Sequence, residues 1–325
     1  MSAYRRSLAG ALALCVWAAG LATAAGVAGA AEPVRALSRG TAHDALYDVA
    51  FEGLDGVAVG GFGKILATVD GGLTWTRVGS APGGQALFGV ARRNGRCVAV
   101  GQQGAVFRAD DCRKWSAVSP YSQARLMAVG MNRHGVAVAV GAFGQVAMSS
   151  DWGASWSSVP VDWSRFVDGG AEPHLYAVDV SDDGSVTVAG EFELILRLQE
   201  GRWKVLHKGE RTLFGLRLLG NGAGYAVGQS GAVLATFDGG ATWRALDSGT
   251  QAILTGIAAT QDGQVIATGI NVIVTSGDSG KTWRALQSPL VRNAWHQAAG
   301  ISDAGSGPRR LVTVGAGGLI LQVNN

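Results

Sequence analysis

The feature of this chain that most constrains its fold is a short motif, Ser/Thr-x-Asp-x-Gly-x-Thr/Ser-Trp, which recurs along the sequence. Four copies are complete, with their aspartate and tryptophan at Asp70 and Trp75, Asp151 and Trp156, Asp238 and Trp243, and Asp278 and Trp283. Two degraded copies retain Asp110 with Trp115, and Trp203 alone. The six tryptophans stand at positions 75, 115, 156, 203, 243 and 283, so successive ones are 40, 41, 47, 40 and 40 residues apart. A repeat of about 40 residues is the size of one β-propeller blade.

A second marker runs in phase with the first and predicts the strands of each unit. It is a Gly-x-x-Gly turn between two apolar runs, at residues 60–63, 101–104, 141–144 and 228–231, with degenerate copies that begin at Gly190, Gly269 and Gly315. Leucine-led apolar segments open five of the units, at 46–49, 87–90, 126–129, 175–178 and 213–216. Each unit is therefore expected to have an inner strand, a second strand ending in the Gly turn, a third ending in the Asp motif, and an outer strand after the tryptophan. We predict an all-β fold, a seven-bladed β-propeller with four-stranded antiparallel blades.

The last unit is short of one strand, and the start of the chain supplies a candidate for it. The expected blades are approximately 41–80, 81–120, 121–162, 163–209, 210–249, 250–288, and 289–325 together with 33–40. The segment Arg35-Ala36-Leu37 repeats the Arg-Ala-Leu pattern that opens the outer strands after Trp243 and Trp283. We therefore expect the N-terminal strand to close the ring, which leaves no open sheet edge between the first and last blades.

The first thirty residues differ in composition from the rest of the chain. Arg5 and Arg6 precede an uncharged run to Ala31 that ends in small residues, the pattern of a signal peptide. We expect residues 1–30 to be a signal peptide, residues 31–325 to be a single propeller, and the protein to be periplasmic or secreted. An uncleaved membrane anchor is the alternative, since the run is long enough to span a bilayer.

Composition and charge exclude several classes of function. With 47% hydrophobic and 16% charged residues, the chain is globular, and its 50 glycines fit many tight turns. Without the two basic residues of residues 1–30, 25 of the 27 basic residues remain against 24 acidic ones. This near-neutral balance argues against nucleic acid as a partner.

The repeated motif is an Asp box, and its aspartates are expected to organise turns instead of catalysing a reaction. A short Asp side chain accepts backbone N–H groups two residues on, and glycine tolerates a positive φ. Asp boxes resemble those of bacterial neuraminidases, but the Arg-Ile-Pro segment typical of those enzymes is missing. Asp48, Asp179, Glu191 and Glu193 are not paired by spacing as glycosidase carboxylates. We expect no catalytic activity and no cofactor or metal, with a carbohydrate-active propeller, a sialidase-like glycosidase or glycan-binding protein, as the alternative.

Three segments of the first blade, 46–49, 57–66 and 70–75, resemble the photosystem II assembly and stability factor family. The resemblance covers essentially the whole chain after residue 30, and it implies a seven-bladed propeller of Asp-box (BNR) repeats without catalytic activity. It further implies a protein partner, a membrane-protein complex or its assembly intermediate, and a monomeric scaffold. In heterotrophic bacteria, relatives of this family accompany exporters of the resistance-nodulation-division type.

Two cysteines, Cys97 and Cys112, fall on the second strand and the Asp-box turn of one blade. An exported protein permits a disulfide between them, and the Gly101–Gly104 turn sets a register in which Cys97 faces Arg108 with Cys112 just beyond. Two free buried thiols are the other interpretation.

The partner is expected to bind the face that carries the Gly turns and the loops between blades. In a four-stranded blade these two sets of loops emerge on the same side of the ring. Three Gly turns carry a phenylalanine where sister blades have Gln103 or Ser230, and an exposed aromatic there suggests contact with a partner. The predicted partner-binding residues are Phe62, Phe143, Phe192, Arg125, Arg211, Arg292, Trp163, Arg165, Phe166 and His174. The alternative is that these aromatic residues cover the ends of their own blades.

Overall fold

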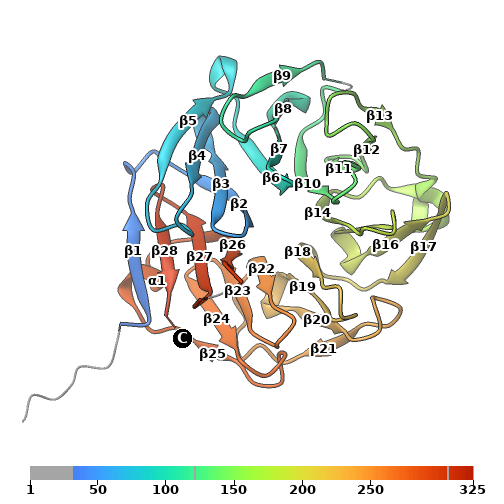
Figure 1. The fold of residues 1–325 in the computed structure, drawn as a ribbon. Coiled ribbons are helices and arrows are strands. Elements are labelled where there is room, and N and C mark those ends of the chain that lie inside the picture. Colours follow the sequence, from blue (N-terminus) through green and yellow to red (C-terminus); the bar gives the residue numbers. More distant parts are fainter. Residues whose placement is uncertain (1–31, 121, 306, 325) are drawn as a thin grey trace, which may run out of the picture. The chain divides into compact units, whose positions relative to one another are not determined.

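The computed structural model describes residues 32–120, 122–305 and 307–324, so the predicted signal peptide lies outside the described residues. The described residues form seven antiparallel sheets of four strands each, arranged around a central axis as in Figure 1. The predicted seven-bladed propeller is therefore confirmed.

Six blades follow the same order from the inner strand to the outer strand. The first three are β2 (Leu46–Glu52), β3 (Asp55–Gly60), β4 (Lys64–Thr68), β5 (Thr76–Ser80); β6 (Leu87–Arg93), β7 (Arg96–Gly101), β8 (Val106–Ala109), β9 (Ser116–Val118); and β10 (Leu126–Met131), β11 (Ala137–Gly141), β12 (Val146–Ser149), β13 (Ser157–Ser158). The next three are β14 (Leu175–Val180), β15 (Val186–Gly190), β16 (Ile195–Gln199), β17 (Arg202–His207); β18 (Leu213–Leu218), β19 (Gly224–Gly228), β20 (Val233–Thr236), β21 (Arg244–Leu246); and β22 (Leu254–Ala259), β23 (Val265–Gly269), β24 (Val272–Ser276), β25 (Arg284–Ala285).

The remaining blade joins the two ends of the described chain. It consists of β26 (His296–Ser302), β27 (Arg310–Gly315), β28 (Ile320–Val323) and, as its outer strand, β1 (Val34–Ser38). β1 runs antiparallel to β28, with Val34 opposite Val323 and Ala36 opposite Leu321. Figure 1 shows this strand beside β28 at the junction of the first and last blades. The predicted closure of the ring by the N-terminal strand is confirmed.

The core lies between neighbouring blades, because the second strand of each blade is covered on both faces. Every residue of β11 is buried, for example. One hydrophobic cluster joins Val57 and Val59 of the first blade to Leu87 and Val90 of the second. The inner strands approach closely around the axis: a Cβ on Gly89 would lie 2.8 Å from the Ala128 Cα. This crowding explains the small residues at the third place of the leucine-led segments.

The complete Asp boxes form the same hydrogen-bonded turn. In the first, Asp70 accepts from the Thr74 N–H at 2.9 Å and from the Thr74 hydroxyl at 2.6 Å, and Thr68 donates to Asp70 at 2.7 Å. The Trp75 indole donates to the Gly72 carbonyl at 2.8 Å. These hydrogen bonds hold the pKa of Asp70 at about 2, against the opposing effect of burial. The corresponding turns at Asp151, Asp238 and Asp278 repeat the bonds to the aspartate.

The degraded box of the second blade departs from the prediction at one residue. Asp111, and not Asp110, accepts the backbone N–H groups of the turn, from Arg113 at 2.9 Å and from Lys114 at 2.8 Å. Asp110 forms an ion pair with Arg108 instead. This box has Arg108 and Lys114 in place of the two hydroxyl residues that donate to the aspartate in complete boxes, and Cys112 takes the place of the glycine with a left-handed φ of 54°.

Cys112 also forms a disulfide with Cys97, with the two Cα atoms 5.1 Å apart. Cys97 pairs with Ala109 across the sheet, one position away from the Arg108 expected from the turn.

In the degraded boxes the Trp115 and Trp203 indole N–H groups are buried and have no hydrogen-bond partner among the described residues. The hydrogen bond from the tryptophan indole to the glycine carbonyl is thus a feature of the complete motif.

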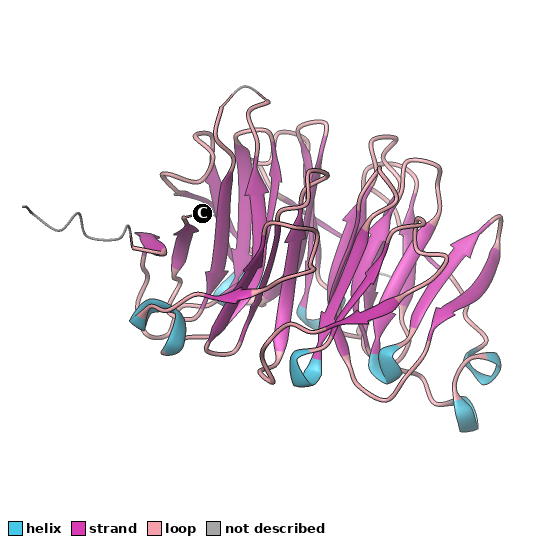
Figure 2. Cartoon of the chain, turned by 90° about the horizontal axis from the view of Figure 1, so that it is seen from below, coloured by secondary structure: helices cyan, strands magenta, loops and turns pink. Residues whose placement is uncertain are grey.

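The two faces of the ring differ in their loops. The Gly turns and the connections between blades lie on one face, and the Asp boxes and inner hairpins lie on the other. Short helical segments occur in the former: η1 (Gly61–Gly63), η2 (Pro82–Gly84), η3 (Gln102–Gly104), η4 (Trp163–Arg165), η5 (Asp168–Gly170), η6 (Glu191–Glu193), η7 (Gln229–Gly231) and α1 (Pro289–Arg292). Figure 2 shows these helices along a single side of the ring. We call this side the Gly-turn face and the opposite side the Asp-box face.

Candidate functional site

Three phenylalanines project from the Gly turns. The exposed fractions of Phe62, Phe143 and Phe192 are 67%, 62% and 37%. Their φ angles are 53°, 55° and 62°, in the left-handed region, and Gln103 and Ser230 adopt the same conformation in sister blades. The turn therefore imposes this backbone conformation whatever the side chain is. An aromatic ring in an unfavourable backbone region that remains exposed gains little from burial, so folding alone does not account for it.

His174 holds the turn of Phe143 in place. Its ring Nδ1 accepts the Phe143 N–H at 3.0 Å, and the backbone N–H of His174 donates to the Glu191 carboxylate at 2.8 Å. The His174 ring also meets the Phe143 ring edge-on, with 5.1 Å between centroids, and the Tyr176 ring at 6.4 Å. Tyr176 in turn contacts Phe214 of the next blade at 5.0 Å. A continuous row of aromatic rings thus crosses three blades.

A second aromatic row lies at the start of other inner strands. Tyr47 contacts Phe88 of the next blade, with 5.3 Å between ring centroids, and stacks on Trp295 of the last blade at 5.9 Å. The exposed Arg125 guanidinium lies over the Phe88 ring, 5.6 Å from its centroid. Tyr47, Phe88, Tyr176, Phe214 and Trp295 are not among the residues predicted to bind the partner, although they lie beside them.

The signal for these rings was present in the sequence. The second place of the leucine-led segments carries, in order, Tyr47, Phe88, Met127, Tyr176 and Phe214. At this place the register between the inner and second strands shifts. The side chain therefore does not follow the regular alternation of the strand, in which its neighbours are buried. We call the surface formed by Phe62, Phe143, Phe192, His174, Tyr47, Phe88, Tyr176, Phe214, Trp295 and Arg125 the aromatic mouth.

The long loop before the fourth blade behaves differently from the prediction. Trp163 is only 6% exposed and packs in a hydrophobic cluster with Val167, while Phe166 is partly buried against the same cluster. The Arg165 guanidinium lies 5.8 Å from the centre of the Phe166 ring. Trp163 therefore packs against Gly144 at the end of the third blade instead of projecting into solvent. Arg165 stays exposed at the edge of this loop.

The two remaining arginines of the prediction, Arg211 and Arg292, differ in their surroundings. Arg211 forms an ion pair with the buried Glu193, whose other oxygen lies 3.2 Å from the His207 ring. Glu193 adopts a positive φ of 45° at a place where sister turns have glycine, and this buried cluster occupies Arg211. Arg292 is exposed in α1. Arg211 is thus part of the scaffold, which leaves Arg125 and Arg292 as accessible cations of the Gly-turn face among the predicted residues, with Arg165 beside them on the long loop.

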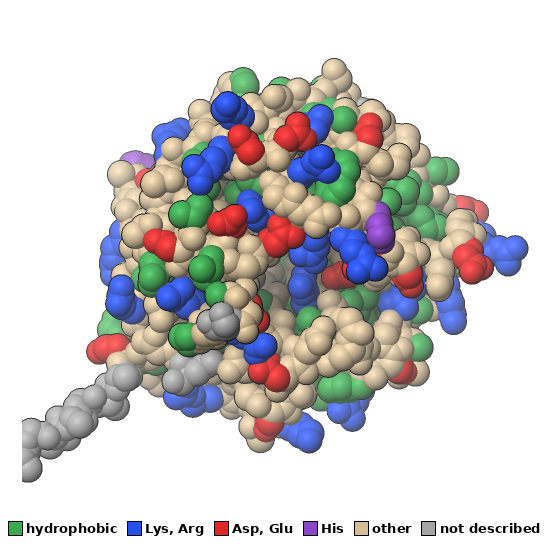
Figure 3. All heavy atoms as spheres, viewed as in Figure 1, with side chains coloured by type: hydrophobic (Ala, Val, Ile, Leu, Met, Phe, Trp, Pro, Cys, Tyr) green, Lys and Arg blue, Asp and Glu red, His purple; other side chains and the backbone are tan. Residues whose placement is uncertain are grey.

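The Asp-box face is hollowed at its centre, and charged side chains of both signs surround the hollow in Figure 3. An axial cavity of about 530 Å³ lies there, lined by the second halves of the inner strands. Its charged residues are Arg92, Arg93, Arg217, Asp48, Asp179 and Asp182, and we call this group the charged mouth.

Asp48 stands where sister strands have glycine or alanine. Its carboxylate accepts the Val90 N–H of the next blade at 2.8 Å and the adjacent Val49 N–H at 2.8 Å. Although part of the side chain is accessible from the cavity, protein surrounds the carboxylate, and desolvation raises its pKa to about 7 against these hydrogen bonds. Asp179 accepts the Leu218 N–H of the next blade at 3.3 Å, and desolvation raises its pKa too.

Asp48 and Asp179 both face the cavity, whereas Glu191 and Glu193 belong to the Gly-turn face. No carboxylate of this set bonds to another, and each accepts hydrogen bonds from backbone or basic groups instead. Among the described ranges, no group of three or more His, Cys, Asp or Glu side chains is arranged to hold a metal ion. In the same ranges, no helix is long and apolar enough to cross a membrane.

Fold and loops together define a seven-bladed β-propeller whose two mouths differ in chemistry. No family model and no curated protein matches the chain. Among solved structures it is similar to YCF48 bound to D1 peptide, with a TM-score of 0.70, 16% identity, and coverage of 90% of this chain and 97% of that one. It is also similar to YCF48 from Cyanidioschyzon merolae (TM-score 0.68, 19% identity, coverage 90% and 98%) and to the WD40 β-propeller domain of Doa1 (0.67, 11%, 90% and 97%). At such identities the similarity shows the fold alone.

Proposed function

We propose that this protein is a non-catalytic scaffold that binds a protein partner through the aromatic mouth. The observation that carries the proposal is the exposure of Phe62 and Phe143 in turns whose left-handed backbone disfavours any side chain. Sister blades build the same turn with Gln103 and Ser230, so the turn does not need an aromatic ring. Aromatic residues are enriched at the energetic centres of protein interfaces, where they lose water on both sides.

The aromatic mouth is also organised before any partner arrives. His174 bonds to the Phe143 backbone and contacts its ring, and Tyr176 continues the row to Phe214. Side chains that are already fixed lose little conformational entropy on binding, which favours affinity. Arg125 over Phe88 adds a cation beside the rings for a carboxylate of the partner.

The class of partner is the finer part of the proposal. The sequence resemblance to photosystem II assembly and stability factors, and the YCF48 fold, support recognition of a polypeptide segment of a membrane-protein complex or its assembly intermediate. The apolar segment within residues 1–30 supports export to the periplasm or outside the cell. In an organism without photosystems, we propose an exporter of the resistance-nodulation-division type as the client, with the propeller acting as a monomer.

The test compares partner recovery by matched surface variants. Phe62→Ser/Phe143→Ser removes two exposed rings of the aromatic mouth, and Phe237→Ser removes an exposed ring from an Asp-box turn on the other face. Affinity purification from envelope extract should recover a polypeptide with wild type and Phe237→Ser, and at least tenfold less of it with the double variant. Equal recovery by all three proteins, or binding on a glycan array without a protein partner, contradicts the proposal.

A further inference from the structure

The axial cavity is distinct from the aromatic mouth and has the size of a small-molecule site. Its volume is about 530 Å³, and all the blades contribute lining residues from their inner strands. Ligand pockets for small molecules have volumes of roughly 300–1,000 Å³ and combine apolar walls with a few polar groups that converge. The cavity has a volume in this range, and its lining combines apolar side chains with a few charged ones.

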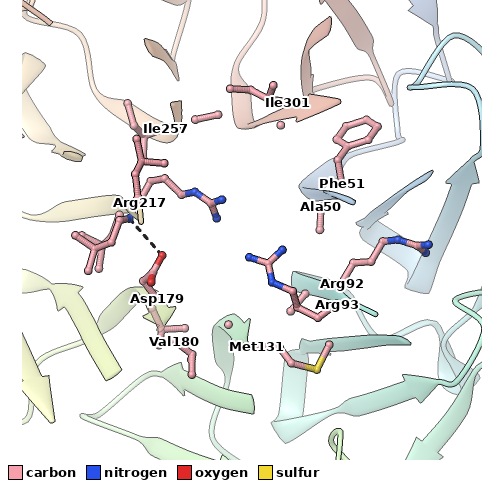
Figure 4. Close-up of a pocket in the computed structure, with 18 of the residues that line it drawn as sticks. Ala50, Phe51, Arg92, Arg93, Met131, Asp179, Val180, Arg217, Ile257 and Ile301 are labelled. Carbon is pink, nitrogen blue, oxygen red and sulfur yellow. Dashed lines mark hydrogen bonds between the residues drawn. The ribbon is translucent and has the colours of Figure 1, made fainter. Parts of the chain in front are cut away.

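Two arginines supply the converging polar groups. Figure 4 shows the Arg93 and Arg217 side chains reaching toward the middle of the cavity from different blades. Neither makes an ion pair or a side-chain hydrogen bond with any other residue in the described part of the chain. Arg92, the neighbour of Arg93, points away from the cavity in Figure 4 and bonds to Asp55 at 2.9 Å, with Glu52 at 3.8 Å. Arg92 is therefore bound to acidic side chains of the scaffold, whereas Arg93 faces the cavity.

The surroundings of these guanidinium groups restrict what they can bind. A guanidinium donates two parallel hydrogen bonds to a carboxylate or a phosphate. Asp179 lies beside both arginines; desolvation raises its pKa, and the positive charges of Arg217 and Arg93 offset part of this rise. A second negative charge on the ligand is repelled by this carboxylate, so a singly charged anion fits better than a phosphate dianion.

The walls of the cavity complete the specificity. Met131, Val180, Ile257 and Ile301 line it together with the arginines in Figure 4. Such walls favour a hydrocarbon group over a strongly hydrated one, because apolar surface gains free energy when it leaves water. A ligand with a carboxylate and a hydrocarbon body therefore fits both the two arginines and the apolar walls of the cavity.

We propose that the axial cavity binds a monocarboxylate with a hydrocarbon body, whose carboxylate is held by Arg93 and Arg217. This chemistry is found in a free short-chain acid and in the C-terminal residue of a polypeptide. The site lies on the Asp-box face, so its ligand and a partner at the aromatic mouth occupy different faces of the ring. The proposal does not depend on the proposed function of the aromatic mouth.

Calorimetric titration of the purified protein tests the site with two pairs of probes: hexanoate and hexanamide, and N-acetyl-alanyl-leucine and its C-terminal amide. We expect at least one of the two acids to bind, and its neutral amide to bind at least tenfold more weakly. Binding of hexanoate alone identifies a free acid, and binding of the peptide acid alone identifies a polypeptide terminus. If neither acid binds, or if amides bind as well as acids, the proposal is wrong.

Substitutions then place the binding in the cavity. Arg217→Gln changes an exposed side chain, so the fold should tolerate it, and it should weaken binding of the acid at least tenfold. Arg93→Gln should do the same, and Arg292→Gln, an exposed arginine of the other face, should leave binding unchanged. Thermal unfolding of each variant confirms that it is folded. Unchanged affinity in folded Arg217→Gln overturns the assignment.

Discussion

The aromatic mouth and the charged mouth are built from opposite ends of the same inner strands, yet their side chains are stabilised in different ways. At the aromatic mouth, rings from adjacent blades contact one another and leave Phe62 and Phe143 exposed. At the charged mouth, carboxylates such as Asp48 bond to the backbone of the next blade, and only some arginines remain free. The first is a surface suited to a large partner, and the second is a cavity suited to a small ligand. The two ends of one set of strands therefore present different chemistry on a fold that repeats.

Opening the ring should have the largest effect, because both mouths require a closed propeller. Deletion of residues 32–40 removes β1, exposes the edge of β28, and takes Val34 out of a cluster with Leu321 and Val323. We expect loss of cooperative thermal unfolding and aggregation on size-exclusion chromatography. Arg35→Ala, which changes an exposed side chain of the same strand, should behave as wild type. A deletion variant with an unchanged melting temperature contradicts the role of β1.

Removing the disulfide should destabilise the fold without altering the aromatic mouth. Cys97 and Cys112 are 15 residues apart, and a loop of this size contributes about 3 kcal/mol in the chain-entropy model. Cys97→Ala/Cys112→Gly installs residues that sister blades carry at these places, as in Ala137 and Gly72. The melting temperature should fall while partner recovery stays at the wild-type level. Reduced recovery by the folded variant shows instead that the two faces are coupled.

The smallest effect concerns Asp48 and depends on pH. Its pKa is about 7 in the folded protein and about 3.9 in an unfolded chain, so the folded state binds more protons between these values. The contribution of Asp48 to stability is therefore greatest in acid and declines as pH rises from about 4 to 7. Asp48→Asn removes this charge, and its melting temperature relative to wild type should be higher at pH 8 than at pH 5. A difference that is the same at both pH values shows that Asp48 does not titrate in this window.

The fold was predictable because it is encoded by local turn chemistry that repeats. Thr68, Asp70 and Trp75 make all their defining bonds within a few residues, so each Asp box specifies its own hairpin. The closing strand pairs with the distant C-terminal strand, yet it was predictable because residues 35–37 repeat the outer-strand pattern of sister blades. Substitutions within the motif can still move such a turn, as in the second blade, where Asp111 takes the role expected of Asp110.

The candidate site was predictable only in part, since it depends on contacts between blades. Exposure of Phe62 and Phe143 follows from their place in a short turn. The burial of Trp163 does not, because the loop around it has no counterpart in sister blades. Arg211 faces a buried glutamate that replaces a turn glycine, and the Tyr47 row depends on a slip in strand register. Each of these features arises from packing between adjacent blades, which no single repeat encodes.

Site-specific crosslinking tests the central claim that the aromatic mouth binds the partner. A photoreactive residue is placed at Phe143, which is 62% exposed on the Gly-turn face, or at Val69, which is 57% exposed in an Asp-box turn. After irradiation in cells, position 143 should crosslink to the same polypeptide that wild type recovers from envelope extract, and position 69 should give at most a tenth of that product. Equal crosslinking from both positions, or crosslinking from position 69 alone, would contradict the account.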